Sequence, residues 1–450
     1  MKMKKLLFVF AGIVFLVFAT HPSVACAEEY TLDDLFRIGL ASSEKIKLSE
    51  ENLTIARLGK NKALSVLIPT FSAYSGYTRY TENKTSDSGS SIQPDGSSSW
   101  GLRMDQSLSL SGREFTALDI AGETIEKSRS DLLQVREDYL LSLSGAFYDM
   151  LKAQKALEIA EANLARLTKY REAAQTRLRV GEATKTALLR AEGELSGARS
   201  DRIKAVNALE SARSALARIV GIDRAFSLKE ERHETYVPSL ERLQEAAMTR
   251  RPELRGLETL KKIADKQVRY AKGSYWPNLS LAAVYARADQ DPPPSNLNRE
   301  SIYGTLNLNF PFYEGGLRKA EVRESEAKQR QAELSYADAV KSIRVEVENA
   351  YLDFATQQGI ITFLRDQLAY AGDNYNAVAK QYEFGLANSI DVIDANNLLL
   401  SAQRQLADAT YSAELSLLKL KRASGTLLEK VAEGDTGRAN GEGAVSPFGK

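Results

Sequence analysis

The chain has 450 residues, with 60 basic and 59 acidic side chains and a formal net charge of +1. This balance argues against a nucleic-acid binder, which would carry a basic surface. With only two histidines and one cysteine, the sequence offers no histidine-rich metal site and no internal disulfide, so we expect neither a metal nor a cofactor.

Residues 1–27 are predicted to be a secretion signal. Lysines precede an apolar run at residues 6–18, and small residues around Cys26 form a cleavage site before Glu28. The run is shorter than the roughly 20 residues of a spanning helix, which disfavours an uncleaved anchor. Lipidation of Cys26 is a second interpretation, disfavoured because Ser23 is a poor residue three positions before a lipidated cysteine.

Short helices are predicted at residues 32–41, 44–67, 240–250 and 252–273, and β-hairpins at about 69–111 and 277–313. In the segment 100–111, Trp100, Leu102 and Met104 share one face of a strand, whereas Arg103 and Asp105 share the other. The segment 302–312 alternates in the same way, and the segments 279–285 and 71–80 do so more weakly.

Each predicted strand has ~10–13 residues, near the length of a tilted membrane strand. An ordinary soluble sheet also fits each strand taken singly. Four strands cannot close a barrel with a lumen, since about eight are needed even for a filled one. An open sheet edge is not tolerated in lipid, so membrane strands here require that several chains share one barrel.

The longest predicted helices cover residues 112–179 and 317–383, roughly 100 Å each at ~1.5 Å per residue. Apolar residues recur in them every seven positions, which indicates coiled-coil seams. Each long helix leads through a glycine-containing turn, at 180–184 or 384–388, into a returning helix at 185–220 or 389–428. Thr184 is expected to cap the first returning helix, and Asn388 or Ser389 the second.

The chain repeats itself. The run at 146–149 returns at 350–353, and Gly181 and Gly221 return as Gly385 and Gly425, all 204 residues later. We therefore predict two repeats, at 28–224 and 225–430, packed as one elongated body, followed by a disordered tail at 431–450.

These features resemble the TolC-type outer-membrane efflux family of Gram-negative bacteria. The resemblance is carried by the doubled layout, the two tip turns, the run 310–316 before the second long helix, and the run 389–395. It implies a mainly α protein with a membrane β-barrel of twelve strands, four from each chain of a homotrimer. A long coiled-coil tunnel would extend from outer-membrane lipid into the periplasm, where a periplasmic adaptor and an inner-membrane transporter would be the partners.

The resemblance also assigns roles to individual residues. The tips would contact the adaptor through Val180, Gly181, Thr184, Phe384, Gly385 and Leu386. Asp391 and Asp394 match the aspartates of the family's pore constriction, and Tyr382 matches a tyrosine of its closing network. The family's latch arginine and aspartate fall on Ala387 and Ala187 here, so the resting gate must be latched differently.

The two aspartates have a second interpretation, because acids near a helix start are stabilised by the helix dipole by ~0.3–1 kcal/mol each. The first repeat builds the same helix with Ala187 and Arg190 at the matching positions, which favours the pore role. We add the hypothesis that Arg190 pairs with Asp391 or Asp394 of a neighbouring tip.

The sequence therefore predicts a passive exit duct for small molecules in the outer membrane, not an enzyme. A duct for type I protein secretion is the alternative within transport. A soluble periplasmic coiled-coil scaffold is the alternative from another class.

Overall fold

The computed structural model describes residues 28–87, 89, 91–223, 226–230, 237–291 and 298–429. The predicted signal, Cys26 and the predicted tail lie outside this range. The chain divides into two compact units, and each is described by itself. The first combines residues up to 42 with 143–236 and 361–411, and the second combines 43–142 with 237–360 and the residues from 412 onward. Each predicted repeat contributes to both units, and the repeats stay a prediction.

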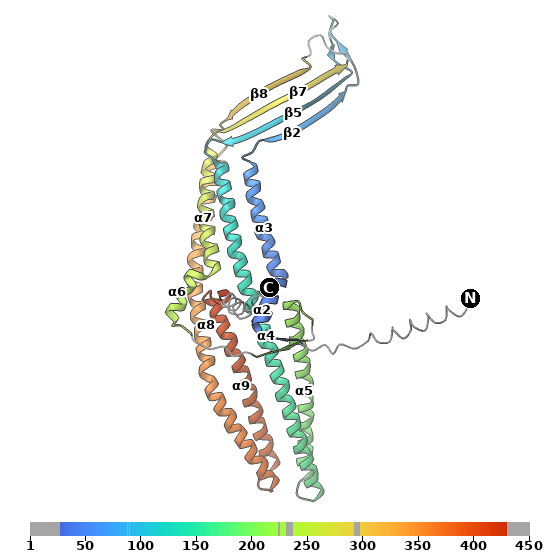
Figure 1. Ribbon diagram of the computed structural model, residues 1–450, viewed down its shortest axis with the longest axis vertical. Coiled ribbons are helices and arrows are strands. Elements are labelled where there is room, and N and C mark those ends of the chain that lie inside the picture. Colours follow the sequence, from blue (N-terminus) through green and yellow to red (C-terminus); the bar gives the residue numbers. More distant parts are fainter. Residues whose placement is uncertain are drawn as a thin grey trace, which may run out of the picture. The chain divides into compact units, whose positions relative to one another are not determined.

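The second unit contains a four-stranded antiparallel sheet. Its strands are β2 (Thr70–Arg79), β5 (Gly96–Ser109), β7 (Asn278–Asp291) and β8 (Glu300–Asn309), in the order β2-β5-β7-β8 (Figure 1). Both predicted hairpins are confirmed, since β2 pairs with β5 and β7 with β8. The pairing of β5 with β7 joins the hairpins. Among the described residues, the outer edges of β2 and β8 have no strand partner.

The two faces of this sheet differ in chemistry. Residues paired across the strands share a face, and Ala73, Leu102, Tyr285 and Ile302 form one such row. The next row on the opposite face is Ser72, Arg103, Val284 and Tyr303. The apolar row is exposed, with Ile302 at 83% of its full accessible surface. The predicted alternation is therefore confirmed, but its apolar side covers no core among the residues that the structure describes.

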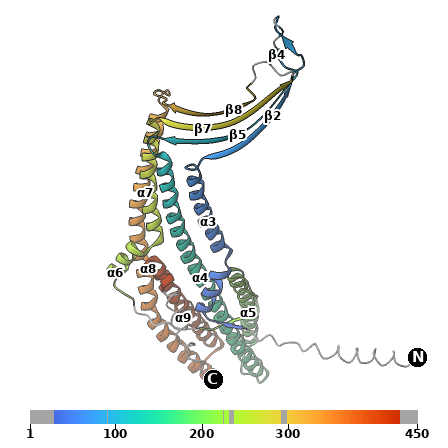
Figure 2. The same cartoon turned by 45° about the horizontal axis from the view of Figure 1, so that its top comes forward.

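The second unit also contains several helices. They are α3 (Glu44–Ser65), α6 (Leu240–Arg250), α7 (Pro252–Lys272), the start of α4 (Arg113–Arg179), the larger, first part of α8 (Leu317–Glu383) and the end of α9 (Ser389–Ala423). A 3-10 turn, η1 (Gly273–Tyr275), follows α7. Figure 1 and Figure 2 both show α3, α4 and α7 side by side in this unit.

The end of α9 lies five residues before the predicted one. Gly425 has a φ of 72°, and the Thr426 amide donates to the Lys421 carbonyl at 2.9 Å. This left-handed closure satisfies the last carbonyls of the helix and stops it at Ala423.

The first unit is built from two helical hairpins, which are the later part of α4 with α5 (Lys185–Val220), and the later part of α8 with the start of α9. It also holds α2 (Leu32–Ser42) and a parallel pair of strands, β1 (Glu28–Tyr30) and β6 (Phe226–Leu228). The sequence analysis missed this pair and the small hairpin β3 (Lys84–Thr85) and β4 (Ser91–Gln93), because strands of two or three residues show no periodicity.

The apolar residues that recur every seven positions are buried or half-buried where these helices pack against their neighbours. Leu143 and Met150 on α4 and Val347 and Phe354 on α8 are buried. Tyr375 packs beside the buried cluster of Ala371, Leu399 and Ala402. In the described part of the chain, no helix is both long enough and apolar enough to cross a membrane.

Candidate gate at the helix tips

The two tips of the first unit have the same backbone construction. Gly181 and Gly385 adopt φ values of 82° and 78°. The amide of Glu182 donates to the Arg177 carbonyl, and that of Leu386 to the Gln381 carbonyl, each at 2.8 Å. These bonds close α4 and α8 with the motif that favours glycine at its left-handed position. Thr184 then caps α5, because its hydroxyl accepts from the Ala187 amide at 3.3 Å.

Apolar side chains project from both tips. Val180, Phe384 and Leu386 are exposed, the last two at about 80% of their full surface. Gly181, Thr184 and Gly385 are exposed beside them. Exposed apolar patches on a soluble surface mark contact sites for other molecules, which fits the predicted role of these tips as docking points.

Asp391 takes part in the cap of α9. The Asn388 side chain accepts from the amides of Ile390 and Asp391 at 2.8 and 3.1 Å, and the Asp391 carboxylate accepts from the Asn388 amide at 2.9 Å. This reciprocal arrangement is a capping box. Asn388 is therefore the capping residue of the two that the sequence left open, and Asp391 has a local structural role.

Asp394 has no such role. Its side chain is exposed one turn further along α9, and within the described residues it makes no hydrogen bond or ion pair. The two aspartates thus share the exposed side of one helix start, but only Asp394 is free of the helix cap. Arg190 is also exposed and makes no ion pair with either aspartate within the described chain.

Tyr382 lies at the centre of a contact between the two hairpins. It is buried, and its ring centroid lies 5.4 Å from that of Tyr170. The Arg177 guanidinium sits 4.4 Å from the Tyr382 ring centroid and donates to the Glu383 carbonyl at 2.8 Å. The Tyr170 hydroxyl donates to the Ser389 carbonyl at 3.1 Å. Two residues of α4 thereby hold the end of α8 and the start of α9.

The contact combines the hydroxyl of Tyr170 with the guanidinium of Arg177. Burial raises the pKa of Tyr170 to about 12, although the hydrogen bond to Ser389 acts in the lowering direction, so its hydroxyl keeps the proton that it donates. The Tyr382 hydroxyl is buried without a hydrogen-bond partner among the described residues. Its ring, not its hydroxyl, therefore makes the contact.

The sequence analysis missed Tyr170 and Arg177. They stand seven residues apart, as Tyr375 and Tyr382 do, so both lie on one face of α4. Extending the seven-residue pattern to the last turns of α4 would have marked this face. A second polar contact lies further from the tip, where Arg166 donates to Asn396 at 2.9 Å and Asn396 donates to Asn163 at 2.9 Å.

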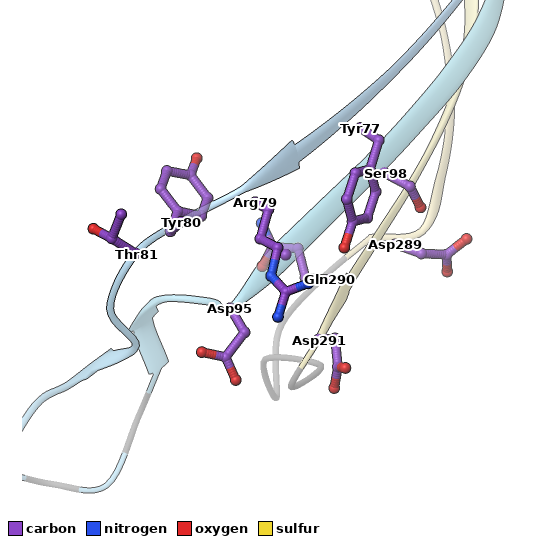
Figure 3. A pocket seen from close by; sticks show the side chains of 10 residues that line it. Tyr77, Arg79, Tyr80, Thr81, Asp95, Ser98, Asp289, Gln290 and Asp291 are labelled. Carbon is purple, nitrogen blue, oxygen red and sulfur yellow. The ribbon is translucent and has the colours of Figure 1, made fainter.

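A polar hollow of about 960 Å³ lies at the loop end of the sheet in the second unit. Figure 3 shows Tyr77 and Arg79 projecting from the same side of the sheet. Cross-strand pairing places them in rows with Asp289 and Asp291, on the face that carries Leu102 and Ile302. Aromatic and charged residues thus end the apolar face, as expected where a membrane strand reaches the interface.

No group of acidic, histidine or cysteine side chains in the described residues is arranged to hold a metal.

Comparison with known proteins identifies the class. Residues 40–222 and 243–426 match the sequence model of a family described as outer membrane efflux protein. The outer membrane protein TolC of Vibrio cholerae is 24% identical over 332 residues, which cover 70% of this chain and 74% of that protein. The outer membrane efflux protein BepC of Brucella suis is 22% identical over 394 residues, covering 86% and 82%.

Solved structures agree in fold. The outer membrane protein VceC of Vibrio cholerae superimposes with a TM-score of 0.76 at 19% identity, covering 88% of this chain and 96% of that chain. The Campylobacter jejuni CmeC outer membrane channel gives 0.79 at 15% identity, covering 91% and 89%.

The chain belongs to the outer membrane efflux protein family. It is a passive exit duct in the outer membrane, and its activity is transport rather than catalysis. The roles of the individual site residues assigned from the sequence stay predictions.

Proposed function

We propose that three copies of this chain form one duct, with a shared barrel of twelve strands in the outer membrane. The sheet carries this proposal, because it has an exposed apolar face and two unpaired outer edges among the described residues. Lipid does not tolerate open edges. Pairing the edge of β8 with the edge of β2 in the next copy closes the barrel.

Helix α8 supports the same assembly. Leu334, Val345 and Leu352 are exposed, while Ile343 and Val347 on the same helix are buried. Spacings of 11 and 7 residues keep the exposed three on one face of the helix. A second apolar face that none of the described residues covers fits contact with another copy.

In the first unit, the tips are the docking surface for a periplasmic adaptor, which connects the duct to an inner-membrane transporter. The contact between Arg177, Tyr170 and Tyr382 is the latch of the resting gate. It supplies a guanidinium from α4, whereas the family's latch arginine falls on Ala387 in this chain. The carboxylates of Asp391 and Asp394, brought together by threefold symmetry, form the constriction and favour cations.

Single-channel recording in planar bilayers tests this function. Wild-type protein is expected to insert and give small cation-selective steps, and Asp391→Ala/Asp394→Ala to lose the selectivity. Because Asp391 also caps α9, the Asp394→Asn variant is the cleaner probe, since it removes one charge per chain and leaves the cap intact. Arg190→Ala is expected to raise conductance if Arg190 pairs with an aspartate of a neighbouring tip.

The outcomes separate the parts of the proposal. Conducting steps that keep their selectivity in every aspartate variant would leave the duct in place and move its constriction elsewhere. Protein that stays soluble without detergent and never inserts would contradict the shared barrel itself.

A further inference from the structure

A cluster of ionised side chains lies in the second unit, where the end of α9 meets α4, α7 and α8. We call it the ionic cluster, and its members are Glu137, Asp138, Arg251, Glu253, Glu346 and Arg422. None of the roles assigned above uses it.

Two arginines hold the ionic cluster together. Arg251, at the junction of α6 and α7, has 3% of its side chain exposed and donates to Glu253 at 2.9 Å and Glu346 at 2.6 Å. Arg422, in the last turn of α9, donates to Asp138 at 2.7 Å, Glu253 at 2.6 Å and Glu346 at 2.9 Å. Since each arginine bridges carboxylates from different helices, the cluster fastens the end of α9 to α4, α7 and α8.

Glu137 is the member without a fixed partner. Its residue is 2% exposed, and its Oε2 atom is buried with no hydrogen bond among the described residues. A buried carboxylate that lacks a partner is costly when ionised. The neighbouring charges are Asp138 on α4, Glu253 on α7, Arg251 before α7, Arg422 on α9 and, across the arginines, Glu346 on α8.

The charge balance of the ionic cluster favours a proton on Glu137. Two guanidinium groups face three carboxylates before Glu137 is counted, so an ionised Glu137 leaves a net charge of −2 in the cluster. Asp138 and Glu346 are half exposed, whereas Glu137 and Glu253 carry their charges in its buried part. Burial, and after it repulsion from Glu253, raises the pKa of Glu137 from 4.5 to about 7, against the opposing effect of the two arginines.

We propose that Glu137 is a proton-binding site that, when protonated, tightens the attachment of α9 to α4 and biases the duct towards its closed form. The inference rests on the duct function proposed above. The same helices α4, α8 and α9 make the tip contacts of Tyr170 and Arg177, so a shift of α9 against α4 disturbs both the ionic cluster and the latch.

The sign of the pH effect follows from linkage. In the tight form, in which α9 is held against α4, the pKa of Glu137 is raised. In the loosened form its pKa is that of an ordinary glutamate, so loosening releases a proton. The ratio of open to closed channels then increases, for each chain that loosens, by up to tenfold per pH unit between about pH 4.5 and about pH 7, and levels off above that. Thermal stability of the detergent-solubilised protein falls over the same interval.

The test compares wild type with Glu137→Gln, an isosteric change that keeps the residue uncharged at every pH. Open probability in bilayers and the apparent unfolding temperature are measured from about pH 5 to about pH 8.5. The variant is expected to hold its low-pH behaviour throughout, with no dependence on pH below 7. Glu123→Gln is the matched control, because Glu123 also lies on α4 and pairs with α7, through Lys266 at 2.9 Å. It should keep the wild-type pH dependence.

Infrared spectroscopy detects the proton on Glu137 directly, and its signal would not change with pH if the role of Glu137 were purely structural. A protonated carboxyl band is expected in wild type at about pH 6, absent at about pH 9 and absent from Glu137→Gln at both. An unchanged band or unchanged pH dependence in Glu137→Gln overturns the proposal. Failure of the wild-type protein to conduct would instead count against the duct, while the infrared and unfolding data would still decide proton binding.

Discussion

At the scale of residues, Tyr170 and Tyr382 have different roles in the tip contact, which the sequence alone does not reveal. Tyr170 contributes a hydrogen bond to the Ser389 carbonyl, whereas Tyr382 contributes its ring to Tyr170 and Arg177. The family resemblance matched Tyr382 to one tyrosine of the closing network and pointed to no residue of α4. The structure adds Tyr170, from the other helical hairpin, as the partner of Tyr382. The polar part of the contact comes from Tyr170.

We expect Tyr170→Phe to weaken the latch by about 1 kcal/mol, the net value of one hydrogen bond, and so to raise single-channel open probability about fivefold. Tyr382→Phe should have almost no effect, because it removes a buried hydroxyl that has no partner. Tyr382→Ala, which removes the ring, should open the channel more than either. Conductance recording checks all three, and a Tyr382→Phe channel as open as Tyr382→Ala would contradict this assignment.

At the scale of elements, the sheet depends on a close approach at Gly101 in β5. A Cβ atom there would meet the backbone carbonyl oxygen of Tyr285 and, at 2.7 Å, the Tyr74 ring. The carbonyl belongs to the neighbouring strand β7, so it cannot move without disturbing the ladder. Gly304 in β8 has no such neighbour, since the nearest atom to its Cβ position lies at 3.9 Å.

Gly101→Ala is therefore expected to destabilise the sheet by about 1–3 kcal/mol, the usual cost of overpacking. It should lower the yield of heat-stable oligomer in detergent. Gly304→Ala is the matched control and should leave the yield unchanged. The comparison is made by gel mobility of samples heated to a series of temperatures, and equal yields for the two variants would show that the strands adjust to the added methyl group.

At the scale of the whole molecule, the exposed face of α8 and the open sheet edges have one explanation in common, which is contact with further copies. A double change of Leu334→Lys and Leu352→Lys places charges in that contact. We expect the trimer to dissociate, because an unpaired buried charge costs several kcal/mol. Mass measurement in detergent checks this, with Leu334→Met and Leu352→Met as the conservative control. A trimer that survives both lysines would place the contact on another face.

Much of the fold follows from local periodicity. The period of seven in α8 and the glycines at 385 and 425 predict where helices run and turn, and α8 begins and ends at the predicted residues. The period of two predicts the strands, and their hairpin partners follow from the short connections. The strands β1 and β6 escaped prediction, because three residues carry no period and their pairing joins segments nearly 200 residues apart.

The sequence by itself thus determined the elements, their faces and, through resemblance, the family. The tertiary structure decided which distant residues meet. Tyr170 reaches Ser389, and Glu137 lies among charges from residues 251 to 422, only because the register between packed helices puts them at one level. Periodicity defines a face along one helix, but the register between two helices is set by the packing of their whole length.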